Sequence, residues 1–277
     1  MSYKTILVHV DGSKRASERI RIAARIAVAE NAHLIGTAVT GLSQIALEGS
    51  GLDFSVPPWS VHLEGMRERA RRALDAFEVL AHAMAVASTE TRLVDDEAGV
   101  AVSLQARYCD LVVIGQTDLD GAPSGLRSDF PEYVLLNSAR PVLIIPAAGH
   151  FEHIGEKVLV AWNAGMEATR AVSAAIPLLR RAQQVDVAVF GAGAESHGAQ
   201  PGADIALYLA RHHIRVEVLQ ESLDTDVGNA LLSGAAERSS DLIVMGGYGH
   251  SRFREIFLGG VTRTVLESMI VPVLMSH

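Results

Sequence analysis

Glycines gather in one stretch near the C-terminus, between an apolar run and a helical pattern. They form two clusters at its ends: Gly246, Gly247 and Gly249, then Gly259 and Gly260. Glycine lets a backbone approach a ligand closely and adopt positive φ. A helix that begins near Gly260 would aim free N–H groups and its positive dipole end at the same place. The stretch therefore predicts an anion site suited to phosphate.

Neighbouring residues could complete this site. Met245 ends the preceding apolar run, and Val261 opens the helical pattern that follows. Thr262 could supply a hydroxyl to a phosphate. His250 and Arg252 could add positive charge, although a solvated loop face explains both equally well.

The elements that must position these residues follow from the hydrophobic pattern. In the second half of the chain, short apolar runs predict strands at Lys157–Trp162, Val185–Phe190, Ile214–Leu219, Leu242–Met245 and Val271–Leu274. Helical patterns separate them at Ala168–Arg181, Ala203–Arg211, Val227–Arg238 and Val261–Ser268. This alternation predicts a parallel sheet with helices on both faces, whose ligands bind beyond the carboxyl ends of the strands.

The same pattern occurs twice. The runs Ile6–Ser13, Asp110–Gly115 and Pro141–Leu143 return, in order, as Val158–Gly165, Asp241–Gly246 and Pro272–Leu274. We therefore expect an α/β fold of two tandem domains, 1–147 and 154–277, each a doubly wound, open, parallel five-stranded sheet. The final strands, Pro141–Ile145 and Pro272–Met275, are expected to meet and form a pseudo-dimer within the chain. The first copy is longer, and its insertion is placed in an irregular loop at Gln44–Ser60.

The spacing Gly246, two residues, Gly249, nine residues, Gly259 resembles the loop of the universal stress protein family. The resemblance covers both copies, and it implies an adenine nucleotide α-hydrolase-like fold. One type of family member binds ATP between the ends of the first and second strands and this loop, whereas another type lacks the loop and does not bind ATP. In the second copy, Ala161 and Trp162 would flank the base, and Val189 matches the apolar position at the second strand's end.

Two positions of the second copy depart from the family pattern. Asn163 stands where ATP-binding members have an Asp, although an amide can still donate and accept hydrogen bonds. Gly260 replaces the family's Ser or Thr, which removes a hydroxyl but keeps the backbone N–H. Thr262, two residues on, could compensate in part.

The first copy departs further. It keeps Asp11 and Gly115, but Asp118, Asp120 and Asp129 stand in the loop that should hold phosphates. These acids would repel a triphosphate unless a metal intervened, and loop acids are more often simply solvated. We interpret the first copy as a scaffold whose loop has degenerated, and we expect no metal site.

Composition excludes other classes of function. The chain has 277 residues and a net charge of −8, with no basic stretch interleaved with aromatic residues, so we expect no nucleic acid partner. Its apolar runs are too short to cross a membrane, and its N-terminus has no signal-peptide pattern. The single cysteine, Cys109, excludes an internal disulfide and is expected to be a buried small hydrophobe. A soluble, cytoplasmic protein is expected.

The expected function is a stress-response protein that binds ATP or a related adenine nucleotide, with or without Mg²⁺, as a regulatory ligand in its second domain. The sequence contains no Walker A loop and no nucleophile elbow, and its one cysteine has no obvious base beside it. No general base is identified in the second copy, so any hydrolysis would be slow. A nucleotide-free structural or interaction protein of the same fold is the alternative. Homodimerisation of the whole chain is left open.

Overall fold

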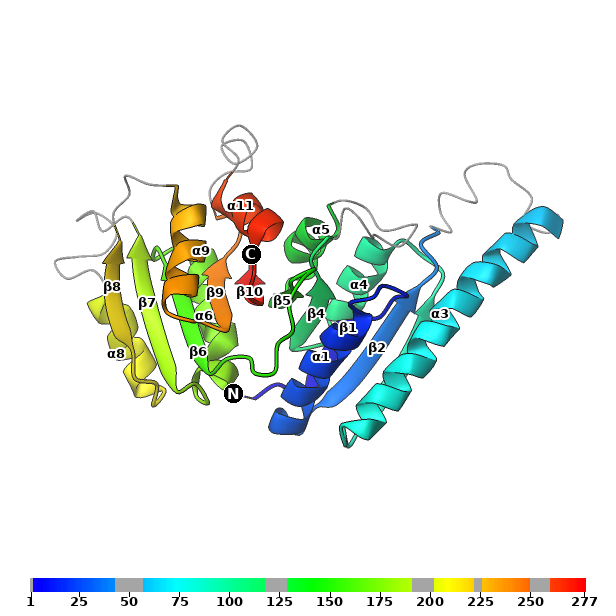
Figure 1. The fold of residues 1–277 in the computed structure, drawn as a ribbon, viewed down its shortest axis with the longest axis horizontal. Coiled ribbons are helices and arrows are strands. Elements are labelled where there is room, and N and C mark those ends of the chain that lie inside the picture. The colour runs from blue at the N-terminus through cyan, green and yellow to red at the C-terminus, as the bar shows by residue number, and fades with distance from the viewer. Residues whose placement is uncertain (1, 43–56, 118–128, 191–201, 222–225, 250–259) are drawn as a thin grey trace. The chain divides into compact units, whose positions relative to one another are not determined.

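A computed structural model describes residues 2–42, 57–117, 129–190, 202–221, 226–249 and 260–277. The chain divides into two compact units, Ser2–Arg140 and Pro141–His277. Strands and helices alternate in both, and the strands are mostly parallel (Figure 1). The predicted α/β class and its two similar halves are therefore confirmed.

The N-terminal unit is a parallel sheet in the order β3-β2-β1-β4. Its strands are β1 (Thr5–His9), β2 (His33–Val39), β3 (Thr89–Val94) and β4 (Leu111–Gly115). Its helices are α1 (Ala16–Glu30), α3 (Pro57–Ala83), α4 (Ala98–Ala106) and α5 (Phe130–Asn137). Helix α1 packs against α3 and α4 against α5, and the two pairs lie on opposite faces of the sheet (Figure 1).

The C-terminal unit contains the last strand of the first repeat and all of the second. Its strands are β5 (Val142–Ile145), β6 (Lys157–Trp162), β7 (Gln184–Phe190), β8 (Glu217–Glu221), β9 (Leu242–Gly246) and β10 (Val273–Ser276). They follow the order β5-β10-β9-β6-β7-β8, parallel except for the antiparallel pair of β5 with β10. The prediction that the two final strands meet is thereby confirmed.

Four helices cover this second sheet. They are α6 (Met166–Leu179), α8 (Ala203–Arg211), α9 (Val227–Glu237) and α11 (Val261–Ser268). Helix α11 packs against α9, whereas α6 packs against β9 and β10. The central strands are buried on both faces, as in Leu242–Met245 of β9, because helices cover each side of a doubly wound sheet.

Several predicted element boundaries differ from the structure by one or two residues, and two differ by more. Residues 57–60 were assigned to the irregular insertion, yet α3 begins at Pro57, because proline is tolerated where the first helical N–H groups have no partner anyway. Strand β8 begins at Glu217 rather than Ile214. The Ile214 N–H instead bonds the Leu209 carbonyl across the left-handed His213, which is a Schellman motif that buries Ile214 against the end of α8.

The structure also bears on the expectations for Cys109, for membrane-spanning helices and for the insertion. Cys109 is buried, and burial raises the pKa of its thiol to about 11. Within the described ranges, no helix is both long and apolar enough to cross a membrane. Residues 43–56, the remainder of the predicted insertion, lie outside the described ranges.

Candidate functional site

The ends of β6, β7 and β9 lie side by side in the C-terminal unit. Trp162 pairs in register with Val189 across β6 and β7, and Ala161 pairs with Ala188. On the other side of β6, Val160 pairs with Val244, which places Met245 next to the end of β6. The structure therefore brings together the strand-end residues that the sequence analysis selected.

Asn163 follows β6 and is exposed at this edge. Its Oδ1 atom accepts a hydrogen bond from the Gly165 N–H at 3.0 Å, just before α6 begins. Gly165 is the N-cap of α6 and provides no side-chain cap. The Asn163 side-chain carbonyl is thus engaged locally, and the rest of its hydrogen-bonding capacity includes the Nδ2 donor group.

Gly246 brings the glycine loop against the start of α6. A Cβ atom at Gly246 would lie 2.5 Å from the backbone N of Ala168 and 2.8 Å from the carbonyl carbon of Glu167. Real Cβ atoms do not approach backbone so closely, so a larger residue would push α6 away. Glycine at 246 is therefore required for packing, independently of any ligand.

Glu167, in the first turn of α6, was not selected from the sequence. Its Oε2 atom lies 2.7 Å from the position that a Cβ of Gly249 would occupy. A carboxylate thus stands beside the loop at which a phosphate was expected. An acid in the first turn of a helix ordinarily signals only a favourable dipole interaction, so the sequence did not reveal this contact.

The far side of the crossover is the start of α11. Its N-cap is Gly260, which has no side-chain cap. The Tyr248 N–H donates to Thr262 Oγ1 at 3.1 Å, and the Gly247 N–H donates to the Ser276 carbonyl at 2.9 Å. Thr262 is 2% exposed, so this buried hydrogen bond joins Tyr248, which follows β9, to the first turn of α11.

The described ranges include most of the residues of the predicted site. Ala161, Trp162, Asn163, Val189, Met245, Gly246, Gly247, Gly249, Gly260, Val261 and Thr262 all lie around one sheet edge or in the crossover beside it. His250, Arg252 and Gly259 lie outside the described residues. The part of the chain that is described contains no cluster of side chains able to hold a metal ion. Asp118 and Asp120 of the first copy also lie outside it.

The same place in the N-terminal unit is filled by a charged cluster. Arg19, 3% exposed, donates from Nε to the His9 carbonyl at 2.6 Å, and its Nη2 lies 3.0 Å from Asp11 Oδ1. A Cβ at Gly115 would lie 2.6 Å from Arg19 Nη1. The guanidinium therefore occupies the space between the ends of β1 and β4. In the second repeat, the buried Ala171 stands where Arg19 stands in the first.

Burial and charge set the protonation of this cluster. Burial lowers the pKa of His9 to about 4, helped by the Arg19 charge and opposed by that of Asp11. Burial alone would raise the pKa of Asp11, but the charges of Arg19 and His9 and two hydrogen bonds from Ser13 outweigh it and lower this pKa. Asp11 is thus an anion already neutralised by its own chain, and His9 is a neutral ring packed 5.0 Å from that of Phe130.

Open, mostly parallel α/β sheets with helices on both faces define the doubly wound class of α/β proteins, to which this chain belongs. The family model described as the universal stress protein family matches residues 2–146 and 156–277. The chain belongs to this family, and its tandem organisation agrees with the two matched segments.

Solved structures show the same fold over nearly the whole chain. A universal stress protein from Archaeoglobus fulgidus DSM 4304 superposes with a TM-score of 0.74 at 18% identity, covering 98% of this chain and 94% of that one. A family protein from Pseudomonas aeruginosa UCBPP-PA14 gives a TM-score of 0.63 at 16% identity, covering 98% and 92%. Among curated protein sequences, none matches significantly.

Proposed function

We propose that the C-terminal repeat binds ATP or a related adenine nucleotide, and that the bound nucleotide acts as a regulatory ligand in a stress response. The observation that carries the proposal is the meeting of two helix N-termini at one sheet edge. Neither α6, after Gly165, nor α11, after Gly260, has a side-chain cap. Uncapped N–H groups and two positive dipole ends favour an anion between them.

The difference between the repeats supports one working site. In the N-terminal repeat, Arg19 takes the space above Gly115 and engages Asp11. In the C-terminal repeat, the uncharged Ala171 stands at the position of Arg19, and Asn163 is exposed. The ATP-binding type of family member, which the glycine spacing resembles, uses these strand ends and this loop. We therefore assign the nucleotide to the C-terminal repeat and a scaffold role to the N-terminal repeat.

The residues around the site favour binding over catalysis. Among the described residues, Glu167 places a carboxylate beside Gly249 of the loop. This carboxylate could contribute one ligand to a divalent cation that accompanies the phosphates. A nucleotide can regulate without being hydrolysed, because it stabilises whichever conformation or partner surface binds it better. Cytoplasmic location and self-association of the chain remain part of this proposal.

The competing function is a structural or interaction protein that keeps the fold without nucleotide. The position of Glu167 favours it, because without a cation the carboxylate would repel phosphate close to Gly249. The missing hydroxyl at Gly260 favours it as well.

Nucleotide content and affinity separate the two functions. The purified protein is denatured and the released material chromatographed, and ATP is titrated calorimetrically with and without Mg²⁺. Gly249→Val should abolish binding, since its side chain fills the loop and meets only the end of the Glu167 side chain. Gly12→Val is the matched control, because a Cβ there meets nothing within 4 Å. Absence of both carried nucleotide and ATP heat would reject the nucleotide proposal.

A further inference from the structure

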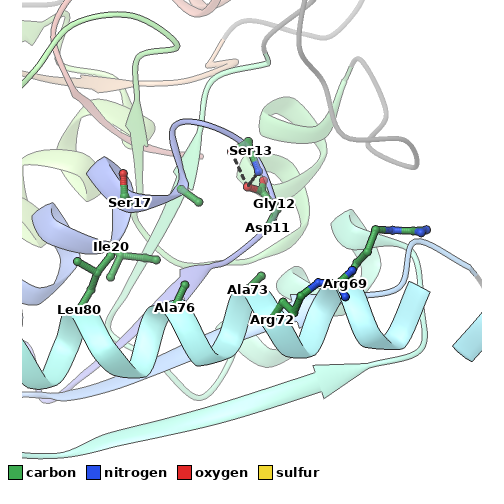
Figure 2. Close-up of a pocket in the computed structure, with 11 residues that line it drawn as sticks. Asp11, Gly12, Ser13, Ser17, Ile20, Arg69, Arg72, Ala73, Ala76 and Leu80 are labelled. Carbon is green, nitrogen blue, oxygen red and sulfur yellow. Dashed lines mark hydrogen bonds between the residues drawn. The ribbon is translucent and has the colours of Figure 1, made fainter. Parts of the chain in front are cut away.

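A groove lies between α1 and α3 of the N-terminal unit, and Asp11 of the charged cluster borders it. It has a volume of about 350 Å³, at the small end of the range for ligand pockets. The β1–α1 loop closes one end of it, with Asp11 and Ser13 above the surface of α3 (Figure 2). The proposed nucleotide site of the C-terminal repeat does not involve this groove.

The floor of the groove is mostly apolar. Ile20 of α1 lies beside Ala76 and Leu80 of α3 (Figure 2), and Ala16 and Ala73 also line the groove. Ala16, Ile20 and Ala73 are at most 8% exposed, whereas Ala76 beside them is exposed. The hollow exists because α1 and α3 place small side chains opposite each other, so it can accept an apolar body without rearrangement of the core.

The mouth of the groove carries positive charge that no described residue pairs with. Of four arginines on this stretch of α3, Arg67 pairs with Asp95 and Glu64, and Arg71 pairs with Glu64. Arg69 and Arg72, the two that line the groove, form no ion pair or side-chain hydrogen bond within the described ranges.

One further feature favours an anion at the mouth. Helix α1 begins there without a side-chain cap, so its positive end faces the same opening. Asp11 also lines the mouth, but its carboxylate is engaged by Arg19 and by the Ser13 N–H at 3.0 Å (Figure 2).

We propose that this groove binds a small amphipathic carboxylate, with its head between Arg69 and Arg72 and its apolar chain along Ile20, Ala73 and Leu80. Guanidinium groups bind carboxylates through paired, charge-assisted hydrogen bonds, and along the floor Ser17 supplies a hydroxyl but no charge. Both arginines are exposed, so the affinity for the carboxylate should fall with added salt. Burial of the ligand's alkyl chain supplies a contribution to binding that salt does not remove.

The experiment titrates the full-length protein with decanoate below its micelle concentration, at pH 7.5 and low salt. Decanol tests the need for the charge, and acetate tests the need for the chain. We expect decanoate alone to bind, with a 1:1 stoichiometry and an affinity that falls at least tenfold in Arg69→Gln/Arg72→Gln. Arg71→Gln is the matched control, because it removes a neighbouring arginine that pairs with Glu64 instead.

A second variant tests the floor. Ala76→Phe places a ring in the groove from an exposed position, so it should block decanoate without loss of fold, checked by thermal unfolding. Absence of decanoate binding, equal binding of decanol, or unchanged binding in Arg69→Gln/Arg72→Gln would each overturn the proposal. ATP binding is measured in the same variants. Its loss in Arg69→Gln/Arg72→Gln would assign the arginines to nucleotide and overturn the proposal as well.

Discussion

Acidification should unfold the N-terminal repeat through His9 before it affects Asp11. His9 is 1% exposed, and burial lowers its pKa to about 4 from an ordinary 6.5. A proton is therefore taken up by the unfolded chain near pH 6.5 but by the folded chain only near pH 4. Folding stability is full above about pH 6.5 and declines as the pH falls through this window.

The magnitude follows from the two pKa values. A shift from 6.5 to about 4 corresponds to about 3 kcal/mol when the whole window is crossed. Between pH 7 and 4.5 the expected loss is about 2 to 3 kcal/mol, which is roughly a sixtyfold increase in the opening equilibrium. The pKa of Asp11 is lowered, so its contribution is lost only below its ordinary value of 3.8, outside this range.

Hydrogen exchange of the β1 amides, corrected for the pH dependence of intrinsic exchange, measures this opening in the N-terminal repeat itself. His9→Gln removes the titrating ring, so its pH dependence between 7 and 4.5 should be flatter than that of the wild type, whatever its absolute stability. The other titrating groups contribute equally to the pH dependence of both proteins, so their contributions cancel in the comparison. Parallel loss of protection in both proteins would refute the assignment of the acid sensitivity to His9.

Three shorter predictions concern other parts of the molecule. Glu167→Gln should raise ATP affinity in the absence of Mg²⁺ by roughly tenfold, because it removes a negative charge beside Gly249; calorimetry showing weaker binding in EDTA would contradict this. Cys109, with its pKa raised to about 11 by burial, should react with a thiol reagent at pH 8 only as fast as the protein opens, and prompt labelling of native protein would be inconsistent with it. Asp226 caps α9 by accepting from the Gly228 N–H at 2.9 Å, so Asp226→Ala should cost about 1 kcal/mol in denaturant unfolding, and an unchanged midpoint would count against the cap.

The local sequence predicted the helices and strands well wherever a segment had either a clear apolar run or a clear helical periodicity. Lys157–Trp162, Ala203–Arg211 and Val261–Ser268 were predicted with the bounds that the structure has. The prediction failed at Ile214, because an apolar residue that closes a helix looks the same in sequence as one that begins a strand. It failed at Pro57 because proline both breaks helices and begins them.

The sequence predicted where the candidate site lies in the fold, but not which side chains make contact there. The repeated strand ends and the spacing of Gly246, Gly249 and Gly259 indicated which edge of which sheet to examine, since parallel strands always end together. Nothing in a linear pattern placed Glu167 beside Gly249, because that contact joins the first turn of one helix to a crossover far along the chain.

The amino-acid sequence by itself determined that this protein is a tandem α/β chain with one glycine-rich crossover, since periodicity, repetition and glycine spacing are properties of short segments. Only the tertiary structure decided that Arg19 fills the N-terminal counterpart of the site. It also decided that Arg67 and Arg71 pair with carboxylates, whereas Arg69 and Arg72 have no such partner among the described residues. The physical reason is that charge pairing and occupied volume depend on which side chains from distant segments share a space, and folding alone brings those segments together.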